Sequence, residues 1–211
     1  MSLQVKLINN RPVNSNCFVI YDMNVNNECI VIDPGTEDCL ELEQFLLEES
    51  LSPVKIVLTH EHFDHCWGCN HLQGKYNIPI LCSELCALRV HHHKTNYSVF
   101  YNPLSTFDIN GDIKTFADGE LLEFNGHKIK FMIVQGHTDS SMVIEVENHL
   151  FTGDALINGH KTVTKLPGGS KQKAIDSRAF FESYKGKGII VHPGHLEEFN
   201  MDDCDLSEIL K

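Results

Sequence analysis

The sequence lacks any uninterrupted apolar run of the roughly 20 residues that a membrane-spanning helix needs. Its opening residues, Met1 to Asn10, also lack the apolar stretch of a secretory signal. Basic residues are scarce, since 17 Lys and Arg stand against 29 Asp and Glu, for a formal net charge of -12 at pH 7. Such a charge repels phosphate backbones. We therefore expect a cytoplasmic protein with neither a membrane nor a nucleic acid as a partner.

A second Cys-x-x-Cys pair is also lacking. The chain has 8 cysteines, but only Cys66 and Cys69 stand at that spacing. Cys17, Cys29 and Cys82 lie within apolar runs, which is typical of buried thiols. We expect reduced, packed thiols rather than a disulfide scaffold or a paired metal or redox site.

The chain shows no repeat, low-complexity tract or Pro/Ser-rich linker, and its 211 residues, 42% of them hydrophobic, suit one domain spanning 1–211. Short apolar or alternating runs predict a β-meander at 3–8, 17–21 and 29–32, and further strands at 54–58, 78–82, 113–116, 121–124, 128–134, 142–146, 150–151 and 188–191. Helices are predicted at 36–49 with Thr36 as N-cap, at 66–76, 83–91 and 174–184, and near the C-terminus. Two strand clusters, each followed by helices, suit two packed sheets with helices outside.

The strongest motif is His60-x-His62-x-Asp64-His65, which directly follows the apolar run 54–58. His and Asp each occur 13 times in the chain, so a chance match to this pattern is expected at a frequency of ~0.003. Imidazole and carboxylate are ligands that zinc and iron accept. His60 and His62 suit one ion, and Asp64 and His65 suit a second.

Four side chains cannot complete two coordination spheres, so the motif predicts further ligands later in the chain. Three polar residues lie in turns that follow apolar strands: His137 after Val134, Asp154 after Phe151, and His195 after Val191. We take these three as the remaining metal ligands.

The ordered motifs Asp33, His60 to His65, His137, Asp154 and His195 resemble those of the metallo-β-lactamase superfamily across most of the chain. The resemblance implies an α/β fold, a four-layer αββα sandwich of two mixed β-sheets flanked by helices, with the metals at one edge. It implies two divalent metal ions, zinc, with iron or a mixed pair as alternatives. Carried over by position, metal one is held by His60, His62 and His137, and metal two by Asp64, His65 and His195. Asp154 bridges the ions, Asp33 supports the ligands, and Asp64 and Asp154 take part in catalysis.

Within the superfamily, Gly153-Asp154-Ala155-Leu156 and Leu166-Pro167-Gly168-Gly169-Ser170 are similar to glyoxalase II, the hydroxyacylglutathione hydrolases, and Pro193-Gly194-His195 resembles their short, single-domain relatives. The resemblance implies a hydrolase that cleaves a small-molecule acyl thiolester with a metal-bridging hydroxide. The chain departs from the pattern at His160-Lys161, where Gly-Arg is common, at Lys165, where an Asp is common, and in the absence of a C-terminal helical domain.

Several alternatives stay open. Lys161 and Lys165, with Lys171 and Lys173, either line the rim of the site and attract an anionic substrate or form a solvated basic face. The run His91-His92-His93 with Tyr97, Phe100 and Tyr101 is either a lid or an exposed loop with anchoring aromatics. The competing functions are a glutathione persulfide dioxygenase with one iron at His60, His137 and Asp154, a phosphodiesterase or ribonuclease, and a non-catalytic metal-binding protein.

Overall fold

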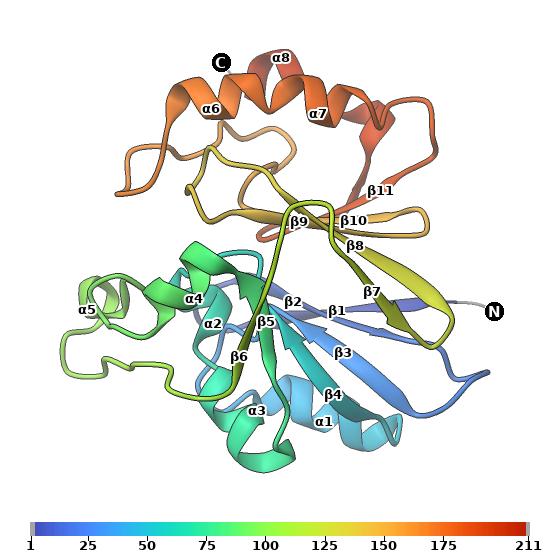
Figure 1. Cartoon of the computed structure of the whole chain (residues 1–211), viewed down its shortest axis with the longest axis vertical. Coiled ribbons are helices and arrows are strands. Elements are labelled where there is room, and N and C mark those ends of the chain that lie inside the picture. The colour runs from blue at the N-terminus through green and yellow to red at the C-terminus, as the bar shows by residue number, and fades with distance from the viewer. Residues whose placement is uncertain (1–2, 210–211) are drawn as a thin grey trace. The chain divides into compact units, whose positions relative to one another are not determined.

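The computed structural model describes residues 3–209. The chain divides into two compact units, Met1–Phe116 and Ala117–Lys211, and each unit is a mixed β-sheet flanked by helices. This architecture of two mixed sheets with helices confirms the predicted α/β fold class (Figure 1). Among the described residues, no helix is both long and apolar enough to cross a membrane.

The sheet of unit 1 has six strands in the order β1 to β6. Their bounds are β1 Gln4–Asn10, β2 Ser15–Tyr21, β3 Glu28–Ile32, β4 Ser52–Val57, β5 Ile80–Ser83 and β6 Ile113–Phe116. The first three strands pair antiparallel, which confirms the predicted meander, and β3 to β6 pair in parallel. The carboxyl ends of β3 and β4 therefore meet at one edge of the sheet, where their following loops lie close together.

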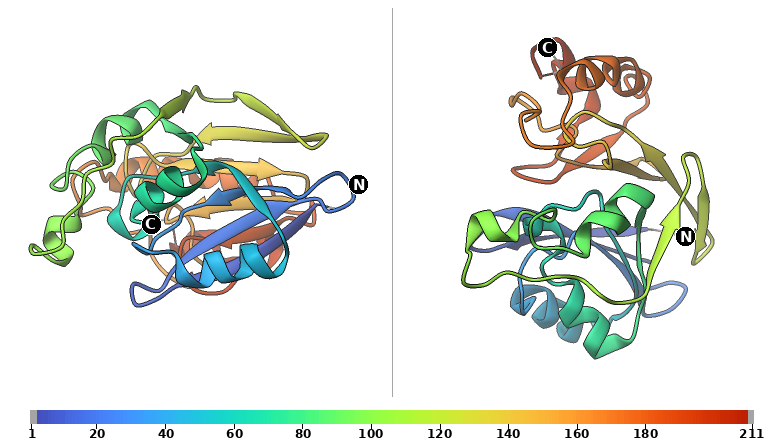
Figure 2. Two further views of the ribbon diagram at one scale, coloured as in Figure 1. Left: turned by 90° about the horizontal axis from the view of Figure 1, so that it is seen from below. Right: turned by 60° about the vertical axis from the view of Figure 1, so that its left-hand side comes forward.

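The helices of unit 1 are α1 Leu40–Glu48, α2 Phe63–Cys66, α3 Cys69–Tyr76, α4 Glu84–Val90 and α5 Ser98–Tyr101. In Figures 1 and 2, α1 and α3 lie along the same face of the sheet. Leu42 and Leu46 of α1 and Leu72 of α3 are buried in one core with Val31 and Ile56 of the central strands. Burial of these alternating strand residues fixes the register of the sheet.

Two helix boundaries in unit 1 differ from the prediction. Thr36 is not the N-cap of the first helix, because α1 begins at Leu40 after Cys39, whose backbone is left-handed. Residues 34–39 instead contact the turn between α2 and α3, where the Gly68 amide donates to the Pro34 carbonyl at 2.7 Å. The helix predicted to begin at Cys66 begins earlier, as α2 within the histidine motif, and is interrupted at Gly68 before α3.

The sheet of unit 2 has six strands in the order β12-β11-β10-β9-β8-β7. Their bounds are β7 Leu121–Phe124, β8 His127–Ile133, β9 Met142–Val146, β10 His149–Gly153, β11 Ile190–Pro193 and β12 Phe199–Asn200. Strands β7 to β10 pair antiparallel, and β11 pairs parallel to β10 and antiparallel to β12. Asn125 and Gly126 both have positive φ, 52° and 83°, so they form the predicted hairpin turn between β7 and β8.

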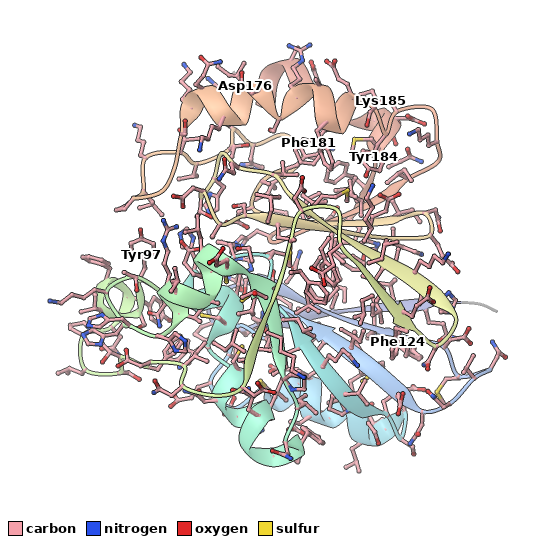
Figure 3. All side chains as sticks on the ribbon, viewed as in Figure 1. Tyr97, Phe124, Asp176, Phe181, Tyr184 and Lys185 are labelled. Carbon is pink, nitrogen blue, oxygen red and sulfur yellow. The ribbon has the colours of Figure 1, made fainter. Side chains whose placement is uncertain are left out.

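The helices of unit 2 are α6 Lys171–Asp176, α7 Arg178–Glu182 and α8 Leu206–Ile209, with a short 3-10 helix at Met201–Asp203. The single helix predicted at 174–184 is divided at Ser177, whose hydroxyl donates back to the Ala174 carbonyl at 2.8 Å and so competes with the helical ladder. Phe181 and Tyr184 (Figure 3) pack in a core with Leu150 and Val191 of the sheet. The Tyr184 hydroxyl donates to Glu145 of β9 at 2.7 Å, and burial raises the pKa of this phenol.

All eight cysteines are free and buried, which confirms the expectation of packed thiols. Burial raises the pKa of the Cys66 and Cys69 thiols well above the ordinary value. Burial of this kind disfavours the thiolate, which is the form that reacts as a nucleophile.

Candidate metal centre

In unit 1, the histidine motif follows directly from β4. His60 and His62 lie in the connection after the strand, whereas Asp64 and His65 lie in the single helical turn of α2. One ligand atom of His60 lies within 4.8 Å of one on His62 and one on His65. Asp64 Oδ2 lies 3.8 Å from His65 Nε2. The structure thus gathers all four motif residues at the carboxyl edge of the first sheet.

Asp33 orients two of these histidines. It follows β3 in a left-handed conformation with φ 53°. Its carboxylate accepts a hydrogen bond from the Thr59 amide at 2.8 Å, from the Thr59 hydroxyl at 2.6 Å and from His65 Nδ1 at 3.0 Å. Because the Thr59 hydroxyl proton goes to Asp33, the Thr59 oxygen accepts from His60 Nδ1 at 3.0 Å.

This network determines which ring nitrogen faces the metal site. A neutral imidazole whose Nδ1–H is donated carries its lone pair on Nε2. The buried carboxylate of Asp33 therefore presents Nε2 of both His60 and His65 as metal donors, directly for His65 and through Thr59 for His60. The resemblance implies that Asp33 supports the ligands, and these hydrogen bonds are the contacts through which it would do so.

Further residues that the sequence did not single out hold the motif in place. Ser15 of β2 donates to the carbonyl of Asp64, and Gly35 approaches the same carbonyl so closely that a side chain there would collide with it. Glu61, within the motif, is fully buried and accepts from Arg89 of α4 at 2.8 Å. The sequence offered one signal for Glu61, an acidic residue between two motif histidines. It gave no signal for the partner, Arg89, which lies in α4.

In unit 2, three residues from separate turns come together. His137 follows the strand β8, Asp154 follows β10 and His195 follows β11. Asp154 Oδ2 lies 3.6 Å from His137 Nε2 and 3.7 Å from His195 Nε2. His137 Nδ1 lies 2.9 Å from the carbonyl of Val163, so it donates there and leaves its Nε2 lone pair toward Asp154.

The separations within each unit suit shared coordination better than direct hydrogen bonding. A distance of 3.6 to 3.8 Å is too long for a hydrogen bond. Two ligands of a tetrahedral zinc ion, each at about 2.1 Å from it, stand about 3.4 Å apart. The donor set of imidazole nitrogens and carboxylate oxygens is also the one that zinc and iron accept. The residues of both units therefore fit metal ligation.

Glycine at position 136 allows the turn that carries His137. Its φ is 154°, and an added Cβ would lie 2.7 Å from Cα of Ala174 in α6. The Gly136 carbonyl also accepts from the amide of Ser170 at 2.8 Å, which ties this turn to the start of α6. A close backbone approach thus determines where His137 lies.

A cavity of about 430 Å³ adjoins these residues in unit 2. It is lined by His137, Asp154 and His195 together with His160, Lys161 and their neighbours. Of the four basic residues considered for a rim, Lys161 lines this cavity, and Lys165 lies exposed on the same segment. Lys173 lines a different cavity, beside Val134 and Phe180.

Other histidines serve different contacts. His192 of β11 lies 2.8 Å from His149 and 2.6 Å from Glu198, and its ring stacks on Phe151 with centroids 4.5 Å apart. The hydrogen bond from His192 lowers the pKa of Glu198. This buried network joins β10 and β11, the two strands that precede Asp154 and His195.

The sequence matches the metallo-beta-lactamase superfamily over residues 10–195. The chain therefore belongs to the metallo-beta-lactamase superfamily, as the motifs predict.

Relatives favour the glyoxalase II-like branch. The probable metallo-hydrolase YqgX of Bacillus subtilis is 25% identical over 168 residues, which are 79% of this chain and 77% of that protein. The hydroxyacylglutathione hydrolase of Serratia proteamaculans is 30% identical over 135 residues, which are 64% of this chain and 45% of that enzyme. The match thus spans less than half of the Serratia enzyme. These similarities support a hydrolase and agree with the predicted branch.

Solved structures share the fold. The BLEG-1 B3 metallo-beta-lactamase has a TM-score of 0.85 and 23% identity, with 94% of each chain covered. TTHA1623 in a di-iron-bound form has a TM-score of 0.79 and 20% identity, covering 93% of this chain and 94% of that one. ETHE1 from Myxococcus xanthus has a TM-score of 0.74 and 19% identity, covering 94% of this chain and 80% of that one. At these identities the likeness establishes the fold alone.

Proposed function

We propose that this protein is a hydrolase with two divalent metal ions that cleaves an acyl thiolester. The observation that carries the proposal is the donor spacing within each unit, 3.8 Å between Asp64 and His65 and 3.6 and 3.7 Å around Asp154. The predicted assignment follows from the resemblance: His60, His62 and His137 for one ion, Asp64, His65 and His195 for the other, with Asp154 between them.

Two bound cations would supply Lewis acidity and a hydroxide near neutral pH. The contribution of the chain is to orient the donor rings. Asp33 orients His60, through Thr59, and His65 so that Nε2 is the free ring nitrogen, and the Val163 carbonyl does the same for His137. The carboxylates of Asp64 and Asp154 would supply negative charge that partly balances the two cations.

A thiolester suits this arrangement because the thiolate leaving group needs no obligatory proton donor. The similarity to hydroxyacylglutathione hydrolases supports this bond class. Lys161 and His160, which line the cavity beside Asp154, favour a substrate that carries a carboxylate, and Lys165 lies on the same segment. We propose zinc as the metal, a small anionic thiolester as the substrate, and the cytoplasm, where eight free thiols stay reduced, as the location.

Metal quantification combined with a thiolester panel tests the proposal. The purified protein is analysed for bound metal, loaded with zinc or iron, and assayed with acyl thiolesters of glutathione, coenzyme A and a neutral thiol. We expect two ions per chain and hydrolysis that prefers the anionic carriers. Asp154→Asn should lower kcat by about 100-fold or more, because it removes the negative charge of a proposed metal ligand that lies near both His137 and His195.

Three results would overturn the proposal. One iron per chain with oxygen uptake on glutathione persulfide would indicate the dioxygenase. Hydrolysis of phosphodiesters alone would indicate a nuclease-type enzyme. Bound metal without turnover on any ester would indicate a metal-binding protein.

A further inference from the structure

The segment between α4 and β6, residues 91–112, is fixed onto the helix that carries Asp64 and His65. The ring of Phe63 in α2 stacks on Tyr101 with centroids 4.6 Å apart, and Trp67, which directly follows α2, stacks on Phe107 at 5.8 Å. Trp67 also meets Tyr101 edge-on at 5.7 Å. Aromatic pairs of this kind stabilise contacts beyond the area that they bury. The segment is thus an anchored part of unit 1.

Within this segment, Tyr97 adopts a backbone conformation that tyrosine rarely adopts. Its φ is 66°, in the left-handed region, which costs a residue with a Cβ about 1 to 2 kcal/mol. Neighbouring contacts hold it there: the buried Asn96 donates to the Phe107 carbonyl at 2.8 Å and accepts from the Ser98 amide at 3.0 Å. Strain of this kind is held where the surrounding structure requires it, often at functional sites.

The strained turn places the Tyr97 ring against His62. The two rings meet edge-on, with centroids 4.9 Å apart and planes at 75°. His62 also meets the ring of His60, with centroids 4.5 Å apart and planes at 72°. The ring of His62 therefore contacts two aromatic neighbours, and His60 and His65 are oriented through Thr59 and Asp33.

We infer that Tyr97 is a positioning residue for His62, holding its imidazole in the orientation required for metal ligation. The inference rests on the proposed function, because it takes His62 as a metal ligand. It goes beyond the motif, because Tyr97 comes from an aromatic segment outside the histidine run.

The test compares Tyr97→Asn with Tyr97→Phe. Asparagine tolerates the left-handed conformation, so Tyr97→Asn removes the ring without adding backbone strain. Phenylalanine retains the edge-on ring. The matched control is Leu104→Ala, since Leu104 is an exposed apolar residue of the same segment. Zinc affinities are measured by chelator competition, and cobalt spectra report the geometry of each ion.

We expect Tyr97→Asn to weaken the binding of one of the two ions by about 3- to 10-fold, which is the range that one aromatic pair contributes. We also expect it to alter the cobalt spectrum. Tyr97→Phe and Leu104→Ala should bind both ions as the native protein does. Equal affinities and spectra for Tyr97→Asn and the native protein would overturn the inference.

A second readout uses the metal-free protein and separates this inference from the proposed function. NMR should show contacts between the ring protons of Tyr97 and His62 in the native protein, and in Tyr97→Asn the contacts between the ring protons of His62 and His60 should weaken. Unchanged contacts between His62 and His60 in Tyr97→Asn contradict the positioning role even if the native protein binds two ions. If the native protein binds no metal, the proposed function fails, whereas weakened contacts in Tyr97→Asn would still show that Tyr97 positions the ring.

Discussion

The proposed metal donors are organised differently in the two units. In unit 1 they come from one short run, residues 60–65, and Asp33 orients two of its histidines through hydrogen bonds. In unit 2 they come from three turns that follow β8, β10 and β11, and His137 is oriented by a backbone carbonyl. The first arrangement therefore depends on a few side chains, whereas the second depends on where strands end. The two units should respond differently to substitution.

The largest effect is expected from Arg89→Met in unit 1. This change leaves the carboxylate of Glu61, fully buried within the motif, without its guanidinium partner. Removing one partner of a buried ion pair costs about 3 to 5 kcal/mol. Denaturant unfolding should show a loss of this size in the free energy of unfolding. Arg89→Met should also lower metal affinity, because Glu61 lies between His60 and His62.

The matched control is Arg178→Met in unit 2, which breaks the exposed Arg178–Glu182 pair within one helix. Exposed pairs of this spacing contribute about 0.3 to 0.5 kcal/mol. A loss of equal size in both variants would show that Glu61 does not depend on Arg89. Replacing Glu61 and Arg89 together by methionine should recover much of the lost stability.

The second effect concerns metal binding. Asp33→Asn keeps the size of the side chain but turns one of its two acceptor oxygens into a donor, which disturbs the contacts to Thr59 or His65. Loss of such a supporting contact lowers metal affinity by about 10- to 100-fold. Chelator competition measures this loss. Asp118→Asn, at an exposed residue that accepts from the Ile133 amide in unit 2, should bind metal as the native protein does.

The third effect probes the backbone of unit 2. Gly136→Ala places a Cβ 2.7 Å from Cα of Ala174 at a φ of 154°, so the turn that carries His137 must shift. We expect a loss of about 1 to 3 kcal/mol in the free energy of unfolding. Gly74→Ala in α3 has open space around its Cβ and should stabilise the protein by about 0.5 to 1 kcal/mol. A neutral Gly136→Ala would show that the turn is not restricted by α6.

The same contrast explains what could be read from the sequence. The motif of unit 1 was visible because its donors are contiguous, and the unit 2 donors were visible because each follows an apolar strand. Hidden from the sequence were contacts between distant elements, such as Glu61 with Arg89 and Ser15 with the Asp64 carbonyl. Their partners depend on how strands and helices pack, which no local pattern reports.

Element boundaries failed for a related reason. Thr36 has the side chain of an N-cap, yet α1 begins four residues later, because residues 34–39 contact the turn at Gly68. Helical periodicity at 174–184 was correct, but Ser177 donates to the Ala174 carbonyl and divides the helix. In both places a tertiary or side-chain contact outweighs the local propensity.

The smallest effect is a pH dependence carried by Glu43 of α1, which joins α1 to α3 away from the motif. Burial alone would raise the pKa of Glu43, but hydrogen bonds from Lys75, Tyr76 and His71 outweigh burial and lower it from 4.5. A carboxyl group with a lowered folded-state pKa stabilises the fold above its unfolded-state pKa, and the contribution disappears as the pH falls through the folded-state value. The difference in unfolding free energy between the native protein and Glu43→Gln, measured without metal, should therefore be constant from pH 7 to about pH 5 and shrink below that. Titration of the metal-site histidines affects both proteins alike and cancels in this difference. Lys75→Met should reduce the same pH-dependent contribution to stability. A difference in unfolding free energy that is equal at pH 7 and pH 3 would show that these hydrogen bonds do not shift the pKa of Glu43.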